Sequence, residues 1–224
     1  MDGNRRWARK RLLPVAMGHK KGAETFRERV SDLAKLGVKH ATFYALSTEN
    51  LQRDSSEVSN LLRLFESQLD DLRRLTNEDD IRLAFIGDLS VFDDKLRSKI
   101  EGIERDCADN RGLVCRLAVN YGAKAELLRA AKLYAANPTF NHTVTKAACD
   151  SDFDAFENCL YTADAPPVDL IIRTGGEKRL SNFLLWQTAY AELYFVDTLW
   201  CDFNKDELTK ALNEYAARNR RHGK

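Results

Sequence analysis

The sequence contains no apolar run that approaches the roughly 20 residues of a membrane-spanning helix. Its N-terminus also lacks the apolar core of a secretory signal peptide. The five cysteines are odd in number, widely spaced and without a Cys-x-x-Cys pair, which argues against a zinc site or a disulfide framework. These absences favour a soluble protein of the reducing cytoplasm.

Net charge is also nearly absent, since 35 Lys and Arg face 34 Asp and Glu for a formal charge of +1. No global positive field favours nucleic acid as a partner, and neither a Gly-x-Gly-x-x-Gly pattern nor a Walker A loop is present. Any anion site must therefore be local. We find no linker, so residues 1–224 are expected to form one domain with an ample core.

Short apolar runs alternate with helical patterns along the chain. Strands are expected near residues 41–46, 81–86, 113–119 and 168–172, and the helix after the third strand is expected to turn Leu127, Ala131 and Tyr134 inward. Alternating strands and helices predict an α/β fold with a central, mainly parallel sheet flanked by helices.

Four short segments carry side chains suited to phosphate chemistry. The chain opens on Asp2-Gly3 followed by Arg5 and Arg6, where a carboxylate and guanidinium groups are suited to a metal ion and its bound phosphates. The alternative is a frayed basic tail. Residues 18–22 are expected to form a glycine-flanked cationic turn at a helix N-terminus, where His19 adds a donor. An ordinary basic loop explains that segment equally well.

The third segment, residues 47–50, follows a buried strand, and open α/β sheets bind ligands at such strand ends. Helix capping is the competing interpretation, although Asp54 and Glu57 already resemble a capping box for the next helix. Residues 120–122 are interpreted as a plain turn.

The fourth segment has Arg173 at the end of an apolar strand, a Gly-Gly turn, and then Arg179 and Ser181. Two guanidinium groups and a hydroxyl are suited to a diphosphate, and surface salt bridges are the alternative. Farther on, Glu192 lies among apolar and aromatic residues, where an acid needs a cation or another specific partner.

Taken together, these motifs closely resemble the cis-prenyltransferase family, in particular the bacterial undecaprenyl diphosphate synthases. The resemblance covers nearly the whole chain, from the opening Met-Asp-Gly-Asn-x-Arg-Trp through Gly-His-Lys-x-Gly and Ser-Thr-Glu-Asn to Arg-Thr-Gly-Gly-Glu-x-Arg-x-Ser and Tyr-Ala-Glu. It implies a homodimeric enzyme that adds isopentenyl diphosphate to an allylic diphosphate such as farnesyl diphosphate, with Mg²⁺ as cofactor. Successive cis additions would give a long-chain polyprenyl diphosphate, with undecaprenyl diphosphate, a lipid-carrier precursor for cell-wall synthesis, as the expected product. Peripheral contact with the inner face of the cytoplasmic membrane is compatible with release of such a lipid.

The resemblance also implies roles for individual residues. Asp2 and Asn50 are the implied catalytic residues, and Asp2 and Glu192 the implied metal ligands. An apolar tunnel would hold the growing chain, with Ala45, Leu113 and Val119 as candidate lining. The implied substrate-binding residues are Gly3, Asn4, Arg5, Arg6, Trp7, His19, Ser47, Thr48, Glu49, Leu51, Arg53, Arg173, Arg179, Leu180 and Ser181.

The chain departs from the family pattern at several places. Leu51 replaces an aromatic residue, Val15 stands where many relatives have a basic one, and Lys178 replaces a histidine. An ammonium group cannot be a metal ligand. The family also has a short apolar strand before Asp-Gly-Asn, so we expect that strand to be missing from the 224 residues.

Two other functions are considered. A noncatalytic cis-prenyltransferase-like partner subunit would be expected to lose Asp2, Arg6 and His19, which this chain retains. The all-helical trans-prenyl synthases are excluded because no Asp-Asp-x-x-Asp motif is present.

Overall fold

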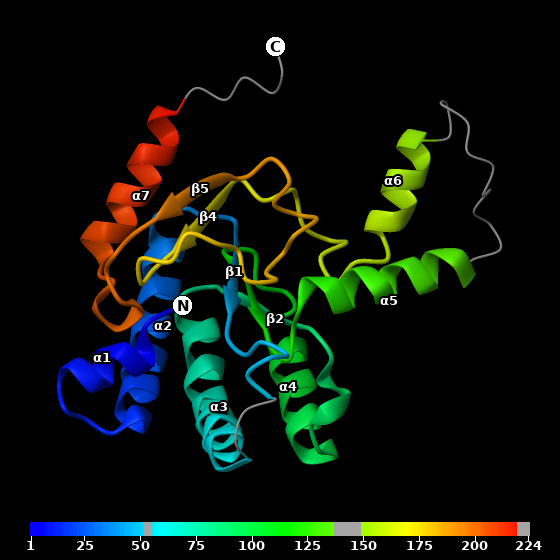
Figure 1. Ribbon diagram of the computed structural model, residues 1–224. Coiled ribbons are helices and arrows are strands. Elements are labelled where there is room, and N and C mark those ends of the chain that lie inside the picture. Colours follow the sequence, from blue (N-terminus) through cyan, green and yellow to red (C-terminus); the bar gives the residue numbers. More distant parts are fainter. Residues whose placement is uncertain (52–54, 137–148, 219–224) are drawn as a thin grey trace.

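The computed structural model describes residues 1–51, 55–136 and 149–218, in which helices and strands alternate along most of the chain (Figure 1). The strands are β1 (His40–Tyr44), β2 (Arg82–Ile86), β3 (Val114–Ala118), β4 (Leu170–Arg173) and β5 (Glu192–Phe195). The helices are α1 (Asn4–Lys10), α2 (Val15–Lys35), α3 (Ser55–Glu78), α4 (Asp94–Asp106), α5 (Ala123–Ala136), α6 (Cys149–Glu157) and α7 (Lys205–Ala217), with 3-10 turns η1 (Leu89–Val91) and η2 (Trp200–Asp202).

All strand pairs are parallel, which confirms the α/β prediction, but the sheet is in two sections. In the first, β3 lies between β1 and β2, so that Leu117 is level with both Phe43 and Phe85. In the second, β4 pairs with β5 and Ile171 lies opposite Leu193. Within the described residues no strand joins β1 to β4, and residues of both strands line one large cavity.

The main core lies on one face of the three-stranded section. Alternation along the strands turns Leu83, Phe85 and Leu117 to that face, where they belong to the same buried cluster as Val30 of α2 and Leu69 of α3. Burial of these side chains holds α2 and α3 over the sheet, each buried Leu or Phe contributing about 1.5–3 kcal/mol. The helices therefore give the strand ends a fixed frame.

The helix boundaries follow local signals in the sequence. Gly37 has a φ of 78° just after α2, and its N–H donates to the carbonyl of Ala34 at 3.1 Å, as in a glycine-terminated helix. Asn204 caps α7, because its side chain accepts from the N–H of Glu207 at 3.0 Å. Both ends agree with the sequence pattern. The expected cap at Asp54 lies outside the described residues.

The predicted inward face of α5 was wrong at Ala131, which is exposed, whereas Leu127 and Tyr134 are half-buried as expected. The fully buried residues of the helix are Ala123, Glu126 and Ala130. Glu126 is bound inside the fold: its carboxylate accepts from the Tyr121 hydroxyl and from the Tyr161 N–H at 2.9 Å. Hydrophobic periodicity does not reveal a buried acid that has hydrogen-bond partners.

Among the described residues, no helix is both long enough and apolar enough to cross a bilayer.

Candidate active site

The backbone of Asp2 is fixed by contacts with two distant segments. Its N–H donates to Thr174 Oγ1 at 3.1 Å, and its carbonyl accepts from Thr174 Oγ1 at 3.1 Å and from the Trp200 N–H at 2.9 Å. The opening residues are therefore an ordered part of the fold, and the frayed-tail interpretation was wrong. Neither Thr174 nor Trp200 was singled out from the sequence, because nothing local indicates that their partner is Asp2.

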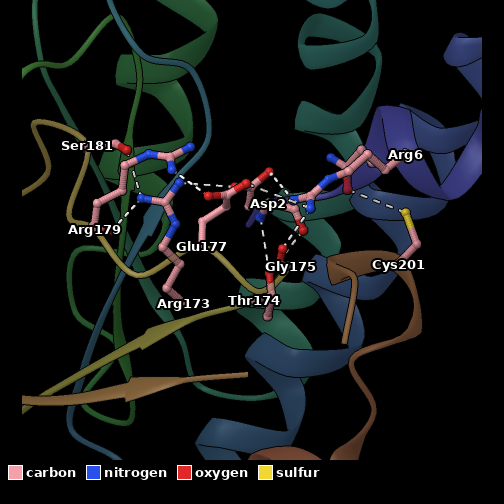
Figure 2. A network of polar contacts seen from close by, with 10 residues as sticks. Asp2, Arg6, Arg173, Thr174, Gly175, Glu177, Arg179, Ser181 and Cys201 are labelled. Atoms are coloured by element: carbon pink, nitrogen blue, oxygen red, sulfur yellow. Dashed lines mark hydrogen bonds and ion pairs between the residues drawn. The ribbon is translucent and has the colours of Figure 1, made fainter. Parts of the chain in front are cut away.

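The Asp2 carboxylate lies between two guanidinium groups (Figure 2). Oδ1 is 3.3 Å from Arg6 Nη2, and Oδ2 is 3.0 Å from Arg173 Nη2. Burial raises the pKa of this carboxyl group, but hydrogen bonding to Arg173 and the charge of Arg6 outweigh that effect, so its pKa is lowered. Asp2 is thus an anion at neutral pH, next to two cations that are suited to binding phosphate.

Arg173 connects Asp2 to the loop that follows the Gly-Gly turn. Its Nη1 donates to Ser181 Oγ at 2.7 Å and to the carbonyl of Arg179. The predicted grouping of Arg173 with Ser181 is therefore present. The side chain of Arg179 instead pairs with Glu177, an acid that the sequence analysis did not single out and that also lies 4.0 Å from Arg6.

The Gly-Gly turn is required by the close approach of Arg6. Gly175 has a φ of 87°, and a Cβ there would lie 2.6 Å from Arg6 Nη2. Arg6 Nη1 donates to the Gly175 carbonyl at 2.7 Å (Figure 2). A residue without a side chain is needed both for the left-handed conformation and for this contact.

The predicted cationic turn at residues 18–22 was wrong, because these residues lie within α2. A Cβ at Gly18 would lie 2.2 Å from the Asn4 carbonyl oxygen, and one at Gly22 would lie 2.8 Å from the Asn4 side chain. The two glycines therefore let α1 cross α2 closely. His19, between them, lines the cavity described below.

We expect Gly18→Ala to destabilise the protein and to reduce any activity that depends on Asn4 or Arg6. The added Cβ would collide with the backbone of Asn4, so α1 would have to shift. Overpacking of this kind typically lowers the free energy of unfolding by about 1–3 kcal/mol. Gly102→Ala is the matched control, since Gly102 lies inside α4 with nothing within 4 Å of its Cβ position. The free energy of unfolding of this control is expected to rise by about 0.5–1 kcal/mol, because alanine has a higher helix propensity than glycine. Urea unfolding of both variants measures the contrast, and equal stabilities would contradict the packing role.

Polar residues after β1 form a second cluster. Asn50 N–H donates to Ser47 Oγ and Ser47 N–H to Asn50 Oδ1, both at 3.2 Å, so each fixes the other. Asn182 donates to Glu49 Oε1 at 3.1 Å and accepts from the Lys124 N–H at 2.8 Å. Asn182 was not predicted as a site residue, although it lies next to Ser181 in the motif.

These clusters lie along a cavity of about 1370 Å³. A second cavity of about 120 Å³ between α2 and α3 is lined mostly by apolar side chains, among them Phe26, Ala45 and Phe65, and His19 lines both. The predicted site residues on the large cavity are Asp2, Gly3, Asn4, Arg5, Arg6, His19, Ser47, Glu49, Asn50, Arg173, Arg179, Leu180 and Ser181.

Three predicted substrate-binding residues do not line either cavity: Trp7, Thr48 and Leu51. The indole N–H of Trp7 donates to Asp202 of η2 at 2.7 Å, and the Arg11 guanidinium lies over its ring. Arg53 lies outside the described residues. Leu113 and Val119 are buried in the main core and do not line a tunnel.

Within one chain, the carboxylate of Glu192 does not lie beside that of Asp2. It begins β5 level with Leu170, three residues along the strand from Arg173, and its carboxylate pairs with Arg218 at 2.7 Å. Three residues of strand span about 10 Å. In the part of the chain that the structure describes, no three His, Cys, Asp or Glu side chains cluster as a metal site. The cation beside Glu192 in the described chain is Arg218, and the implied metal role of Glu192 stays a prediction.

Comparison with known proteins gives one consistent family. Residues 1–223 match the family model described as "Putative undecaprenyl diphosphate synthase". The chain is 43% identical over 224 residues to the ditrans,polycis-undecaprenyl-diphosphate synthase, (2E,6E)-farnesyl-diphosphate specific, of Pseudomonas aeruginosa, covering 100% of this chain and 88% of that one. It is 42% identical over 224 residues to the isoprenyl transferase of Neisseria gonorrhoeae, covering 100% and 87%.

Solved structures agree with the sequence comparison. Lavandulyl diphosphate synthase from Lavandula x intermedia, in complex with dimethylallyl diphosphate, superposes with a TM-score of 0.91 at 36% identity over 100% of this chain and 95% of that one. A probable undecaprenyl diphosphate synthase from Campylobacter jejuni gives a TM-score of 0.79 at 32% identity over 92% and 93%. The chain therefore belongs to the undecaprenyl diphosphate synthase family of cis-prenyltransferases.

Proposed function

We propose that this protein adds isopentenyl diphosphate to an allylic diphosphate, with farnesyl diphosphate as the primer and undecaprenyl diphosphate as the product of successive cis additions. The observation that carries the proposal is the Asp2 carboxylate held between Arg6 and Arg173 on a large cavity. Guanidinium groups suit diphosphates, and the apolar side chains nearby suit a hydrocarbon. The names of the relatives in Pseudomonas and Neisseria support the same reaction.

In the proposed reaction the bond between the allylic C1 and its diphosphate oxygen breaks. A carbon–carbon bond forms from C1 to the terminal methylene of isopentenyl diphosphate, and that unit then loses a proton. Arg6, Asn4 and His19 would hold the leaving diphosphate, and their charge and donors would stabilise it as it departs. Arg173 and Ser181 would hold isopentenyl diphosphate, and Asn50, fixed by Ser47, would lie where the proton is lost.

The residues present fit Mg²⁺ bound mainly through substrate. Mg²⁺ typically uses one or two carboxylates together with phosphate oxygens and water. Asp2 is an ionised carboxylate with 36% of its side chain exposed, next to two phosphate-binding cations. Asp2 would therefore hold Mg²⁺ together with a diphosphate, and Mg²⁺ would supply charge neutralisation for the leaving group. Glu192 would need a different arrangement from that in the single chain to take part.

We also propose a homodimer with the β5 edge and α6 at the interface. Phe153, Tyr190 and Leu193 are exposed large apolar side chains there, and Tyr190 is 83% exposed. The rings of Phe153 and Trp186 lie next to each other at an interplanar angle of 47°, with centroids 6.0 Å apart, which extends the apolar surface. Such a surface is typical of a protein interface. A single monomer mass in sedimentation equilibrium would contradict this part of the proposal.

We also propose that the protein contacts a membrane peripherally, so that the lipid product can pass into the bilayer.

The reaction is tested with purified protein, Mg²⁺, farnesyl diphosphate and labelled isopentenyl diphosphate. We expect label in butanol-extractable lipid, and we expect EDTA to abolish incorporation and added Mg²⁺ to restore it. Chromatography of the dephosphorylated product then gives its chain length. Absence of incorporation at every primer and metal concentration would refute the enzyme proposal and favour a noncatalytic partner subunit.

A further inference from the structure

The turn between α1 and α2, together with the first residues of α2, exposes three large apolar side chains within six residues. Leu12 is 96% exposed, Met17 46% and Leu13 38%. Figure 1 shows this turn, in blue, at the outer edge of the molecule. We name residues 9–20 the hairpin tip. Leu12 packs against almost nothing in its own fold, so its apolar surface faces solvent.

The conformation of the hairpin tip is fixed and, at Leu12, unfavourable. Leu12 N–H donates to the Arg9 carbonyl at 3.1 Å, and Leu13 N–H donates to the Ala8 carbonyl at 3.0 Å. Leu12 itself has a φ of 55°, in the left-handed region that disfavours branched side chains and suits glycine. An ordered turn thus holds a strained, fully exposed leucine outward. The two hydrogen bonds are those of a Schellman motif that ends α1, and Leu12 occupies the left-handed position that glycine usually fills there.

The hairpin tip is also strongly cationic. Residues 1–21 contain seven Lys and Arg and one acid, Asp2, in a chain whose total charge is only +1. Arg9, Lys10 and Lys20 are exposed, and among the described residues none of these three forms an ion pair. An apolar centre is therefore surrounded by cations that have no acidic partner in the described fold.

We propose that the hairpin tip docks on an anionic lipid bilayer, with Leu12 inserted among the headgroups and Arg9, Lys10 and Lys20 on lipid phosphates. Apolar side chains beside cations are suited to such a surface. A protein partner is disfavoured because three side chains fall far short of the roughly 800 Å² that each partner buries in a stable interface. A second copy is disfavoured because two cationic tips repel. Arg9 also lines the large cavity, so docking would bring that cavity near the bilayer. This position would help a lipid product leave the cavity, a consequence that rests on the proposed function.

The test is sedimentation of the whole protein with vesicles, without substrates. One set is phosphatidylcholine alone, and the other contains about 30% phosphatidylglycerol. We expect at least about tenfold tighter binding to the anionic set, and loss of that preference at high salt. Leu12→Gly, which fits the positive φ and should keep the fold, is expected to weaken binding to anionic vesicles about tenfold. Lys10→Glu is expected to weaken it by about tenfold or more.

Val91→Ser and Lys95→Glu are the matched controls, since they change an exposed apolar residue and an exposed lysine elsewhere. Both are expected to bind vesicles like the unchanged protein. Equal binding to the two vesicle sets, or full binding by Leu12→Gly, would overturn the proposal. So would a smaller oligomer for Leu12→Gly without lipid, which would assign the tip to a second copy. Because no turnover is measured, failure of docking leaves the prenyl-transfer proposal intact, and failure of turnover leaves docking intact.

Discussion

Asp2→Ala is expected to lower kcat for isopentenyl addition by about 10²–10³-fold, the range seen when a group that stabilises developing charge is removed. The KM values for both substrates should change far less, because Arg6 and Arg173 remain to bind phosphate. The reason is the position of the carboxylate, 3.0 Å from Arg173 and 3.3 Å from Arg6, where it can hold Mg²⁺ against the leaving diphosphate. Steady-state kinetics with each substrate varied in turn measures this split.

Asp109→Ala, an exposed aspartate after α4, is the matched control and should leave both constants unchanged. Asp2→Asn separates charge from shape, since an amide keeps the size of the side chain but is a poor Mg²⁺ ligand. We expect it to resemble Asp2→Ala in kcat. If Asp2→Ala lost affinity for substrates but kept kcat, Asp2 would be a binding residue only and the proposed role in ionisation would be wrong.

The lowered pKa of Asp2 adds a pH dependence with a defined sign. Its pKa in the folded protein lies below the ordinary value of 3.8. The stability that the ionised carboxylate contributes is therefore present above that ordinary value and is lost as pH falls through the lower folded value. A loss of activity between about pH 5 and pH 7 would have to arise from a group other than Asp2.

Arg173→Lys is expected to raise the KM for isopentenyl diphosphate by about 10–100-fold, with a smaller fall in kcat. Arg173 contacts Asp2, Ser181 and the carbonyl of Arg179 at the same time. Lysine has one ammonium group and cannot reproduce this planar fork. Loss of a charged hydrogen bond costs about 1.5–3 kcal/mol, which corresponds to this change in affinity.

Arg97→Lys on α4 is the matched control, because Arg97 pairs only with Asp94 of its own helix among the described residues. It should leave the kinetics unchanged. The KM for the allylic primer should rise less than that for isopentenyl diphosphate in Arg173→Lys. A larger effect on the primer would assign Arg173 to the other diphosphate, and no effect on either would remove it from the site.

Local patterns were sufficient for much of the fold. The strands near residues 41–46, 81–86 and 113–119 form within one or two residues of their expected bounds, and Gly37 and Asn204 delimit their helices as glycine and asparagine commonly do. These features depend on short-range preferences of the backbone and on hydrophobic periodicity. Periodicity failed at Ala131 of α5, which is exposed, and it did not reveal that the carboxylate of Glu126 is buried.

By itself, the sequence determined the fold class, the family and the side chains available for phosphate chemistry, because motifs and periodicity are written within short segments. Only the tertiary structure decided which of those side chains meet. Asp2 and Arg173 are 171 residues apart and form an ion pair, whereas Asp2 and Glu192, both implied metal ligands, do not come together in one chain. Gly18 and Gly22 serve helix packing, and Trp7 lies outside the cavity. The physical reason is that contact depends on how helices and strands pack, and packing combines residues from the whole chain.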